Sequence, residues 1–450
     1  MNHHKDLEHK DLAHKDLEHK DLAHKDLEHK DLEHKDLEHK IEITPEEERM
    51  LNGEKGPTTA KAMNLLLALA KIHGAPRFVK VKSVQVSGVS YHNLGDPGLE
   101  FLNEWAQSGR ASMITATLNP AGMDLRHWNK QGISEDFAKK QTAVVDAYVS
   151  MGIVPACTCT PYLAGNLPRF GESIAWAESS AVTFANSVIG ARTNREGGPA
   201  ALAAALTGRT PYWGLHLEEN RKPDVLVKAG VELVDSHEWG LLGAFIGRRA
   251  PGCIPYIQLS DRDQLSDRDY EPGIAPLKSL SAALPTFGAL PMFHAEKITP
   301  EAHLVALPEK SIFYGKDERA ETIRSLEDPF ERPDLVCLGC PHATLNEMTE
   351  VVYLLQGRQV KVPFWLCTSR AVYELAAGVG VLKELEKCGV DVVCDTCFVV
   401  APLRGLFNKV MTNSAKGCYY ARGHNKLKVR IATTQKCVEV ACSPSQKQTP

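Results

Sequence analysis

Apolar and polar positions along this chain follow two periods, and together they predict an α/β protein. Helical spacing runs through residues 60–72, 135–151 and 179–189, and a further helix is expected to begin at Thr44-Pro45, ahead of acidic residues. Short apolar runs with strand character lie at 78–86, 112–118, 153–157, 335–338, 362–367 and 390–394. Such alternation is typical of layered α/β domains, whose binding loops lie at strand ends.

Residues 1–40 follow a different pattern. A five-residue unit, His-Lys-Asp-Leu-Glu or His-Lys-Asp-Leu-Ala, repeats from residue 3 to residue 40. Five residues advance a helix by roughly 140° beyond a full turn, so the leucines form no continuous apolar stripe. We expect a disordered, solvated low-complexity tail. A histidine ladder that binds metal is the alternative.

Length and composition indicate a soluble protein of several domains. The chain has 450 residues, 43% hydrophobic and 24% charged. We expect α/β regions at 41–210, 211–330 and 331–442, and a polar tail at 443–450. The net charge of −4 argues against a nucleic-acid partner. No apolar run is long enough for a membrane span, and no secretion signal begins the chain, so we expect a cytoplasmic protein.

Three of the twelve cysteines stand in distinctive runs: Cys159 in Cys-Thr-Pro-Tyr-Leu, Cys340 in Gly-Cys-Pro-His and Cys397 in Asp-Thr-Cys. Each is expected in a loop just past a strand. Three thiolates suit an iron–sulfur cluster that leaves one iron open to substrate. The spacing of Cys337/Cys340 and Cys394/Cys397 also allows a zinc site, although the gap between the pairs exceeds the roughly 15 to 20 residues of a compact zinc ribbon. Structural or redox-active thiols are the third alternative.

Several longer runs resemble the aconitase X family over residues 41–442. They are Ser87-Gly88-Val89-Ser90-Tyr91, Thr117-Leu118-Asn119-Pro120-Ala121-Gly122-Met123-Asp124, Cys157-Thr158-Cys159-Thr160-Pro161-Tyr162, Trp176-Ala177-Glu178-Ser179-Ser180, Ala185-Asn186-Ser187, 190–198, Gly339-Cys340-Pro341-His342 and Asp395-Thr396-Cys397. The resemblance implies an aconitase-like large subunit with layered α/β domains around an iron–sulfur site.

The resemblance also implies residue roles. Cys159, Cys340 and Cys397 would hold a [4Fe-4S] cluster. The implied substrate positions are Gly88, Val89, Ser90, Asn119, Pro120, Glu178, Ser179 and Lys416. The implied base is a serine of a separate small, swivel-domain subunit, so no catalytic base is assigned in this chain. Arg192 and Arg195 are added because guanidinium groups suit phosphate and carboxylate, although ion pairing between domains is an equally ordinary role.

Two activities are implied by the family. One dehydrates (R)-5-phosphomevalonate to trans-anhydromevalonate 5-phosphate in a modified mevalonate pathway of isoprenoid biosynthesis, with a large and a small subunit. The other dehydrates cis-3-hydroxy-L-proline, usually as one fused chain. The Asn119–Asp124 run and the short tail after residue 442 favour the phosphorylated hydroxy acid. The alternative outside the enzymes is a non-catalytic zinc or thiol protein that acts as a scaffold.

Overall fold

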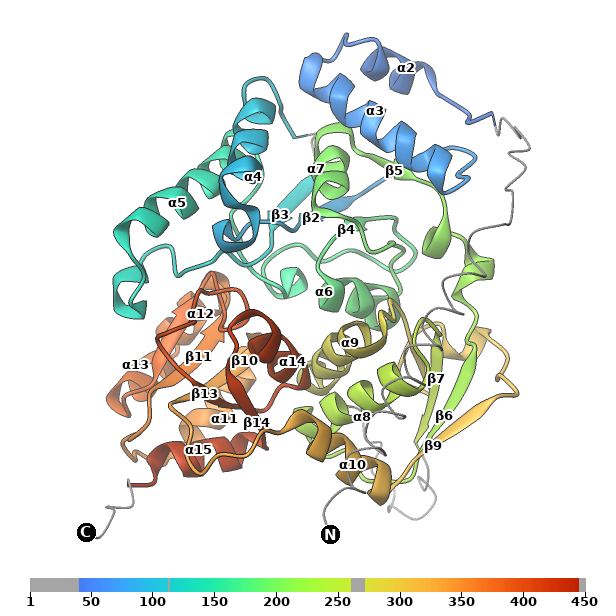
Figure 1. The fold of residues 1–450 in the computed structure, drawn as a ribbon. Coiled ribbons are helices and arrows are strands. Elements are labelled where there is room, and N and C mark those ends of the chain that lie inside the picture. The colour runs from blue at the N-terminus through green and yellow to red at the C-terminus, as the bar shows by residue number, and fades with distance from the viewer. Residues whose placement is uncertain (1–39, 112–113, 260–271, 445–450) are drawn as a thin grey trace, which may run out of the picture. The chain divides into compact units, whose positions relative to one another are not determined.

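The structure, a computed structural model, describes residues 40–111, 114–259 and 272–444. It divides into two units, Met1–Lys40 and Ile41–Pro450, and the fold below is that of the second unit (Figure 1). The predictions of a disordered tail and of a histidine ladder concern residues 1–39, which lie outside the described residues. In the part of the chain that is described, no helix is both long and apolar enough to cross a membrane.

The first sheet positions the substrate loops expected from the sequence. It is parallel, with the order β3-β2-β4, and a two-stranded antiparallel pair, β1-β5, lies outside it. Its elements are β1 (Phe78–Lys80), β2 (Ser83–Val86), β3 (Thr115–Leu118), β4 (Ala175–Trp176), β5 (Arg209–Pro211), α2 (Pro45–Leu51), α3 (Pro57–Ile72), α4 (Tyr91–Ala106), α5 (Glu135–Ser150), α6 (Ser179–Phe184) and α7 (Gly198–Thr207). Buried aliphatic side chains of α3, α5 and α7 pack with those of β2 and β3 in one core.

Helix α2 shows why the predicted helix start is correct. Thr44 accepts from the Glu47 N–H, and the Glu47 carboxylate accepts from the Thr44 N–H at 2.9 Å, which is a complete capping box. Pro45 takes the first helical position, where its missing N–H has no cost.

Three element predictions in this region need correction. The single strand at 78–86 is two strands in different sheets, because Lys82 turns away to bond Ser173. The strand at 153–157 is only one bridge, Val154 to Thr117, since Pro155 has no N–H and Cys157 has a φ of 43°. The helix at 179–189 changes from α to π geometry at Ala185–Ile189 and ends at Gly190.

The second sheet is parallel, with the order β8-β7-β6-β9. Its elements are β6 (Val225–Ala229), β7 (Pro255–Leu259), β8 (His294–Ala295), β9 (Ser311–Tyr314), α8 (Ser236–Arg249), α9 (Ile274–Gly288) and α10 (Lys316–Leu326). One face of α8 and α9 packs on this sheet, and their other face packs toward the third sheet (Figure 1). A Cβ on Gly243 would stand 2.7 Å from that of Ala283, so glycine permits the close contact of the two helices.

The third sheet is parallel, with the order β12-β11-β10-β13-β14, and helices cover both faces. Its elements are β10 (Leu335–Ala343), β11 (Phe364–Thr368), β12 (Asp391–Cys394), β13 (Lys409–Thr412), β14 (Lys428–Ile431), α11 (Leu345–Leu355), α12 (Arg370–Gly378), α13 (Val381–Lys387), α14 (Ala415–His424) and α15 (Thr434–Cys442). Leu335 and Cys337 face α14, whereas Val336 and Leu338 face α11 and α15.

The predicted strand at 335–338 is longer than expected. It continues to Ala343, with a register shift against β11 between Leu338 and Ala343. Gly339, with a φ of 87°, and a cis Cys340–Pro341 bond lie in this irregular part. The expectation that Cys340 lies in a loop past the strand is therefore wrong: it lies within the irregular end of β10. Cys397 does follow β12 in a turn, as expected.

Short 3₁₀ segments complete the described chain. They lie at Trp128–Gln131, Pro161–Leu163, Gly214–His216, Glu218–Arg221 and Ala302–Leu304. The second of them directly follows the Cys159 turn, and the fourth contributes to the cavity described below.

Candidate functional site

The three cysteines expected to bind a cluster meet in the structure from distant parts of the chain. Cys159, Cys340 and Cys397 are all buried. Burial raises the pKa of Cys397 well above its usual value, and the nearby Cys340, Cys367 and Cys159 add to the rise. Burial likewise raises the pKa of Cys159 to about 12, where Cys340 contributes again. Such mutual effects require short separations, so the three thiols share one buried neighbourhood.

The arrangement does not match a site for one metal ion. No three His, Cys, Asp or Glu side chains in the described ranges are placed to hold a single ion. All twelve cysteines lie within those ranges and none forms a disulfide. The Cys337 sulfur lies 3.7 Å from that of Cys367, between β10 and β11. The two Cys-x-x-Cys pairs form no group that could hold one zinc ion among the described residues.

A buried polar network lies beside these cysteines. Glu178, at the start of α6, accepts from Lys416 of α14 and from Asn119 Nδ2 at 2.9 Å. Ser180 Oγ donates to the same carboxylate at 2.9 Å. Burial raises the pKa of both Cys159 and Cys340, and the ammonium of Lys416 opposes that rise, which places its charge close to both thiols. The structure thus joins Asn119, Glu178 and Lys416 in one group.

Both charges in this network persist at neutral pH. Burial by itself would raise the pKa of Glu178, but the Lys416 ammonium and the Asn119 and Ser180 hydrogen bonds bring it down to about 2. Burial opposes the charge on Lys416, yet the Glu178 carboxylate raises its pKa above the ordinary value. One acceptor remains free, because Asn119 Oδ1 is buried without a partner among the described residues.

The loop of Gly88, Val89 and Ser90 presents its backbone N–H groups without an acceptor in the described part of the chain. The carbonyl oxygens of this loop, in contrast, accept hydrogen bonds. Tyr148 OH donates to Gly88 O at 3.0 Å, and Gln141 Nε2 donates to Val89 O at 2.8 Å. Gly88 has a φ of 83°, a conformation that glycine adopts readily. Free backbone N–H groups are able to bind an anion.

This loop faces the turn that carries Cys397. Ser90 Oγ donates to Val400 O at 3.3 Å, and the Val400 N–H bonds back to Cys397 O at 3.1 Å. Pro120 and Ser179, the remaining residues implied by the resemblance, are buried next to Asn119 and Glu178 in the sequence. The implied positions therefore lie on loops and on the first turns of α6 and α14.

Sequence reasoning missed several polar residues that hold these loops. Gln85 of β2 donates to Thr158 O at 3.0 Å and accepts from the Glu178 N–H at 3.4 Å. Arg370 pairs with both Asp124 and Asp395, which fixes the turn before Cys397. A buried glutamine in an apolar strand was the only available signal for Gln85. The arginine and its two aspartates are too far apart in sequence to be paired by inspection.

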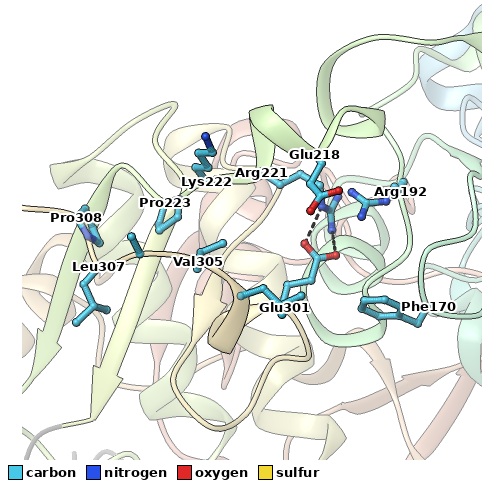
Figure 2. A pocket seen from close by; sticks show the side chains of 12 residues that line it. Phe170, Arg192, Glu218, Arg221, Lys222, Pro223, Glu301, Val305, Leu307 and Pro308 are labelled. Carbon is cyan, nitrogen blue, oxygen red and sulfur yellow. Dashed lines mark hydrogen bonds and ion pairs between the residues drawn. The ribbon is translucent and has the colours of Figure 1, made fainter.

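Of the two arginines predicted as anion ligands, Arg192 lies in a separate cavity, whereas Arg195 forms a backbone bridge with Trp176. Arg192 lines a cavity of about 390 Å³ that contains none of the residues above. Figure 2 shows it near the buried pair of Arg221 and Glu301, whose Nη2 and Oε1 atoms are 2.8 Å apart. Arg192 Nη1 is buried and has no partner among the described residues, while Arg195 is exposed. Their proposed role in anion binding stays a prediction.

Three family models match nearly the whole described chain. They are described as Aconitase X first domain, second domain and third domain, and they match residues 40–219, 223–324 and 333–443. These ranges carry the three sheets in turn, and the cysteine neighbourhood draws on the first and the third.

Named relatives agree with this assignment. The phosphomevalonate dehydratase large subunit of Methanocaldococcus jannaschii is 43% identical over 84% of this chain and 94% of its own. The cis-3-hydroxy-L-proline dehydratase of Pseudomonas aeruginosa is 36% identical over 88% of this chain and 69% of its own. The crystal structure of Thermococcus kodakaraensis aconitase X in its holo-form has a TM-score of 0.81 at 38% identity, and the match covers 89% of this chain and 100% of that one. With its three domains matched in order and its fold shared, the chain belongs to the aconitase X family.

Proposed function

We propose that this chain is the large subunit of a dehydratase that removes water from (R)-5-phosphomevalonate and forms trans-anhydromevalonate 5-phosphate, a step of a modified mevalonate pathway. One observation carries the proposal. Three buried cysteines, a buried Glu178–Lys416 pair and a loop of free N–H groups border one another in a member of the aconitase X family. The choice of substrate is supported by the higher identity to the Methanocaldococcus protein, 43% against 36% for the hydroxyproline enzyme.

The donor set fits a [4Fe-4S] cluster. Cys159, Cys340 and Cys397 supply three soft thiol ligands that carry no disulfide. Ligands that each bind a different iron need not converge on one point, which agrees with the lack of a single-ion site among the described residues. When bound, such a cluster supplies an open iron that acts as a Lewis acid on the departing hydroxyl group.

The chain's own residues bind and orient the substrate. The free N–H groups of Gly88, Val89 and Ser90 suit an anionic group, phosphate or carboxylate. The unpartnered Asn119 Oδ1 suits a substrate hydroxyl proton. Lys416 is held charged by Glu178, so it offers fixed positive charge where negative charge develops on the substrate carboxylate.

The reaction needs a base for the carbon next to the carboxylate. We propose that this base is a serine of a small subunit, since the closely similar relatives are named large subunits. The base takes the proton from that carbon, and the tertiary hydroxyl leaves from the neighbouring carbon as a carbon–carbon double bond forms. The proton and the hydroxide together make one water molecule.

The test is turnover of two substrates by the chain co-expressed with its small subunit and purified without oxygen. Water loss from (R)-5-phosphomevalonate, with cis-3-hydroxy-L-proline at least tenfold slower, is the expected result. Faster turnover of the hydroxyproline would favour the fused-enzyme activity. Iron and acid-labile sulfide of about four each per chain are expected, whereas zinc without sulfide would favour the scaffold alternative. Turnover by the large subunit alone would overturn the proposed base.

A further inference from the structure

His342 lies where the three cysteine-bearing segments meet. Its Nδ1 is 2.9 Å from Thr158 Oγ1, and its Nε2 is 2.9 Å from Thr396 O. Its backbone N–H donates to Cys159 Sγ at 3.3 Å. Thr158 precedes Cys159, Thr396 precedes Cys397, and His342 itself follows Cys340 by two positions. The fully buried imidazole of His342 thus bonds the residues just before Cys159 and Cys397. Its own segment carries Cys340.

The partners of the ring define its tautomer. A carbonyl oxygen only accepts, so the hydrogen of the imidazole must be on Nε2, facing Thr396 O. Nδ1 then accepts from the Thr158 hydroxyl. That hydroxyl in turn accepts from the Thr160 N–H at 3.1 Å. Each group in this chain of hydrogen bonds donates to the next, from Thr160 through Thr158 and His342 to Thr396. Both ring nitrogens of His342 therefore have a partner.

The backbone that carries the ring is also held. Lys278 of α9 donates to His342 O at 2.8 Å and to Pro341 O at 3.2 Å. Its third contact is the Glu347 carboxylate at 2.6 Å, so the buried ammonium is neutralised. The position of the imidazole is therefore fixed from helix α9 as well as from the cysteine segments.

We propose that His342 is a positioning residue for the cluster: it sets the separations of the Cys159, Cys340 and Cys397 sulfurs and aims a backbone N–H at Cys159. This inference rests on the proposed [4Fe-4S] site. Hydrogen bonds around cluster sulfurs tune the reduction potential and slow the loss of iron, and residues behind metal ligands commonly change metal affinity by about 10- to 100-fold. The expected effect of the imidazole is of that size.

The experiment compares variants of the full chain purified without oxygen. His342→Ala removes both ring bonds, His342→Gln can reach only the Thr396 carbonyl, and Thr158→Val removes only the hydroxyl donor. Thr158→Ser keeps that donor. The matched control is His294→Gln, because His294 is equally buried but bonds Arg221 O at 2.7 Å in the second sheet.

Four quantities are measured: iron and sulfide per chain, the rate of cluster loss to a chelator, the EPR spectrum of the reduced chain, and the unfolding midpoint of the metal-free chain. We expect His342→Ala to lose its cluster about 10- to 100-fold faster, with a changed EPR spectrum. Partial effects are expected for His342→Gln and Thr158→Val, and none for Thr158→Ser. His294→Gln should lower the unfolding midpoint but leave the loss rate unchanged.

Two results with the variants would overturn the proposal. One is a wild-type loss rate and EPR spectrum in His342→Ala; the other is equally fast loss in His294→Gln, which would indicate a merely structural role. If the wild-type chain holds iron and sulfide but, assembled with its small subunit, leaves phosphomevalonate unchanged, only the proposed substrate fails, and the variants still decide the role of His342. If it holds no iron and sulfide, the cluster and the role of His342 fall together.

Discussion

Lys416 and Glu178, 238 residues apart in the sequence, form a buried ion pair whose side chains are 9% and 12% exposed. The pair joins α14, in the third-domain range, to α6, in the first-domain range. Its charges border the thiols of Cys159 and Cys340. A contact of this kind is both a part of the candidate site and a link between the domains that form it.

Lys416→Met is expected to destabilise the chain by about 3 to 5 kcal/mol, because it leaves the Glu178 carboxylate buried without its cation. The double variant with Glu178→Gln should recover most of this loss, since no uncompensated charge remains. Neither variant should turn over substrate. Chemical denaturation measures the stabilities. Lys61→Met is the control, because Lys61 and Glu104 form an exposed ion pair that contributes less than about 1 kcal/mol to stability. Equal effects of the two lysine substitutions would contradict the prediction.

Glu196 predicts a pH dependence outside the cysteine region. Burial raises its pKa from the ordinary 4.5 to about 7, against a hydrogen bond from Thr210 that lowers it. The unfolded chain therefore loses this proton first, and wild-type stability falls as pH rises from about 4.5 to about 7. Glu196→Gln removes this pH-dependent loss of stability. Its free energy of unfolding should therefore equal that of wild type at pH 4 and exceed it by up to about 3 kcal/mol at pH 8.

Urea denaturation of the metal-free chain at several pH values measures this difference. The exposed Glu104→Gln serves as the control, since an exposed carboxyl gives no comparable trend. A gap between Glu196→Gln and wild type that stays constant from pH 4 to pH 8 would show that Glu196 titrates normally.

Arg370 is expected to hold the Cys397 turn in place. It bonds Asp124 at 2.8 Å and also pairs with Asp395. Arg370→Leu leaves two carboxylates close together without a cation, so we predict a loss of about 3 to 5 kcal/mol and a low iron content. Even Arg370→Lys should lose iron faster, because an ammonium does not reproduce the fork of a guanidinium. Arg126→Leu, which breaks an exposed pair with Glu374, should change neither quantity.

Gly339 is expected to accept no side chain. Its φ is 87°, and a Cβ there would lie 2.0 Å from Cys367 O. Gly339→Ala should cost at least about 1 to 3 kcal/mol from backbone strain, with the clash added, and should displace Cys340. Gly378→Ala is the control, because nothing lies within 4 Å of its Cβ position. The unfolding temperature and the iron content are measured for both variants. Wild-type values in Gly339→Ala would disprove the expected clash.

Local patterns predicted the elements well and their junctions poorly. The Thr44 capping box and the apolar spacing of α3 and α5 depend on neighbours in sequence, so they could be recognised directly. The break between β1 and β2 depends on Ser173, and the extension of β10 to Ala343 depends on pairing with β11. Such partners are distant in sequence and become visible only in the folded chain.

The same distinction holds for the site. Cys159, Cys340 and Cys397 were recognisable because each stands in a distinctive run. The partners of those runs were not: neither the pairing of Lys416 with Glu178 nor the bonds of His342 to Thr158 and Thr396 follow from spacing. Spacing did not show either that Arg192, in a family motif, lines a cavity apart from the cysteines, and its role in anion binding stays a prediction.

The separation of Lys416 from Glu178 also constrains the order of events during synthesis. A nascent chain that extends to residue 390 contains Cys159 and Cys340 but neither Cys397 nor Lys416. At that stage Glu178 has no cation opposite it, and a cluster would have two of its three ligands. The first-domain range therefore cannot reach its final state as it leaves the ribosome. The proposed cluster could take its third ligand only after Cys397 has been translated, so its loading would have to follow synthesis of most of the third-domain range.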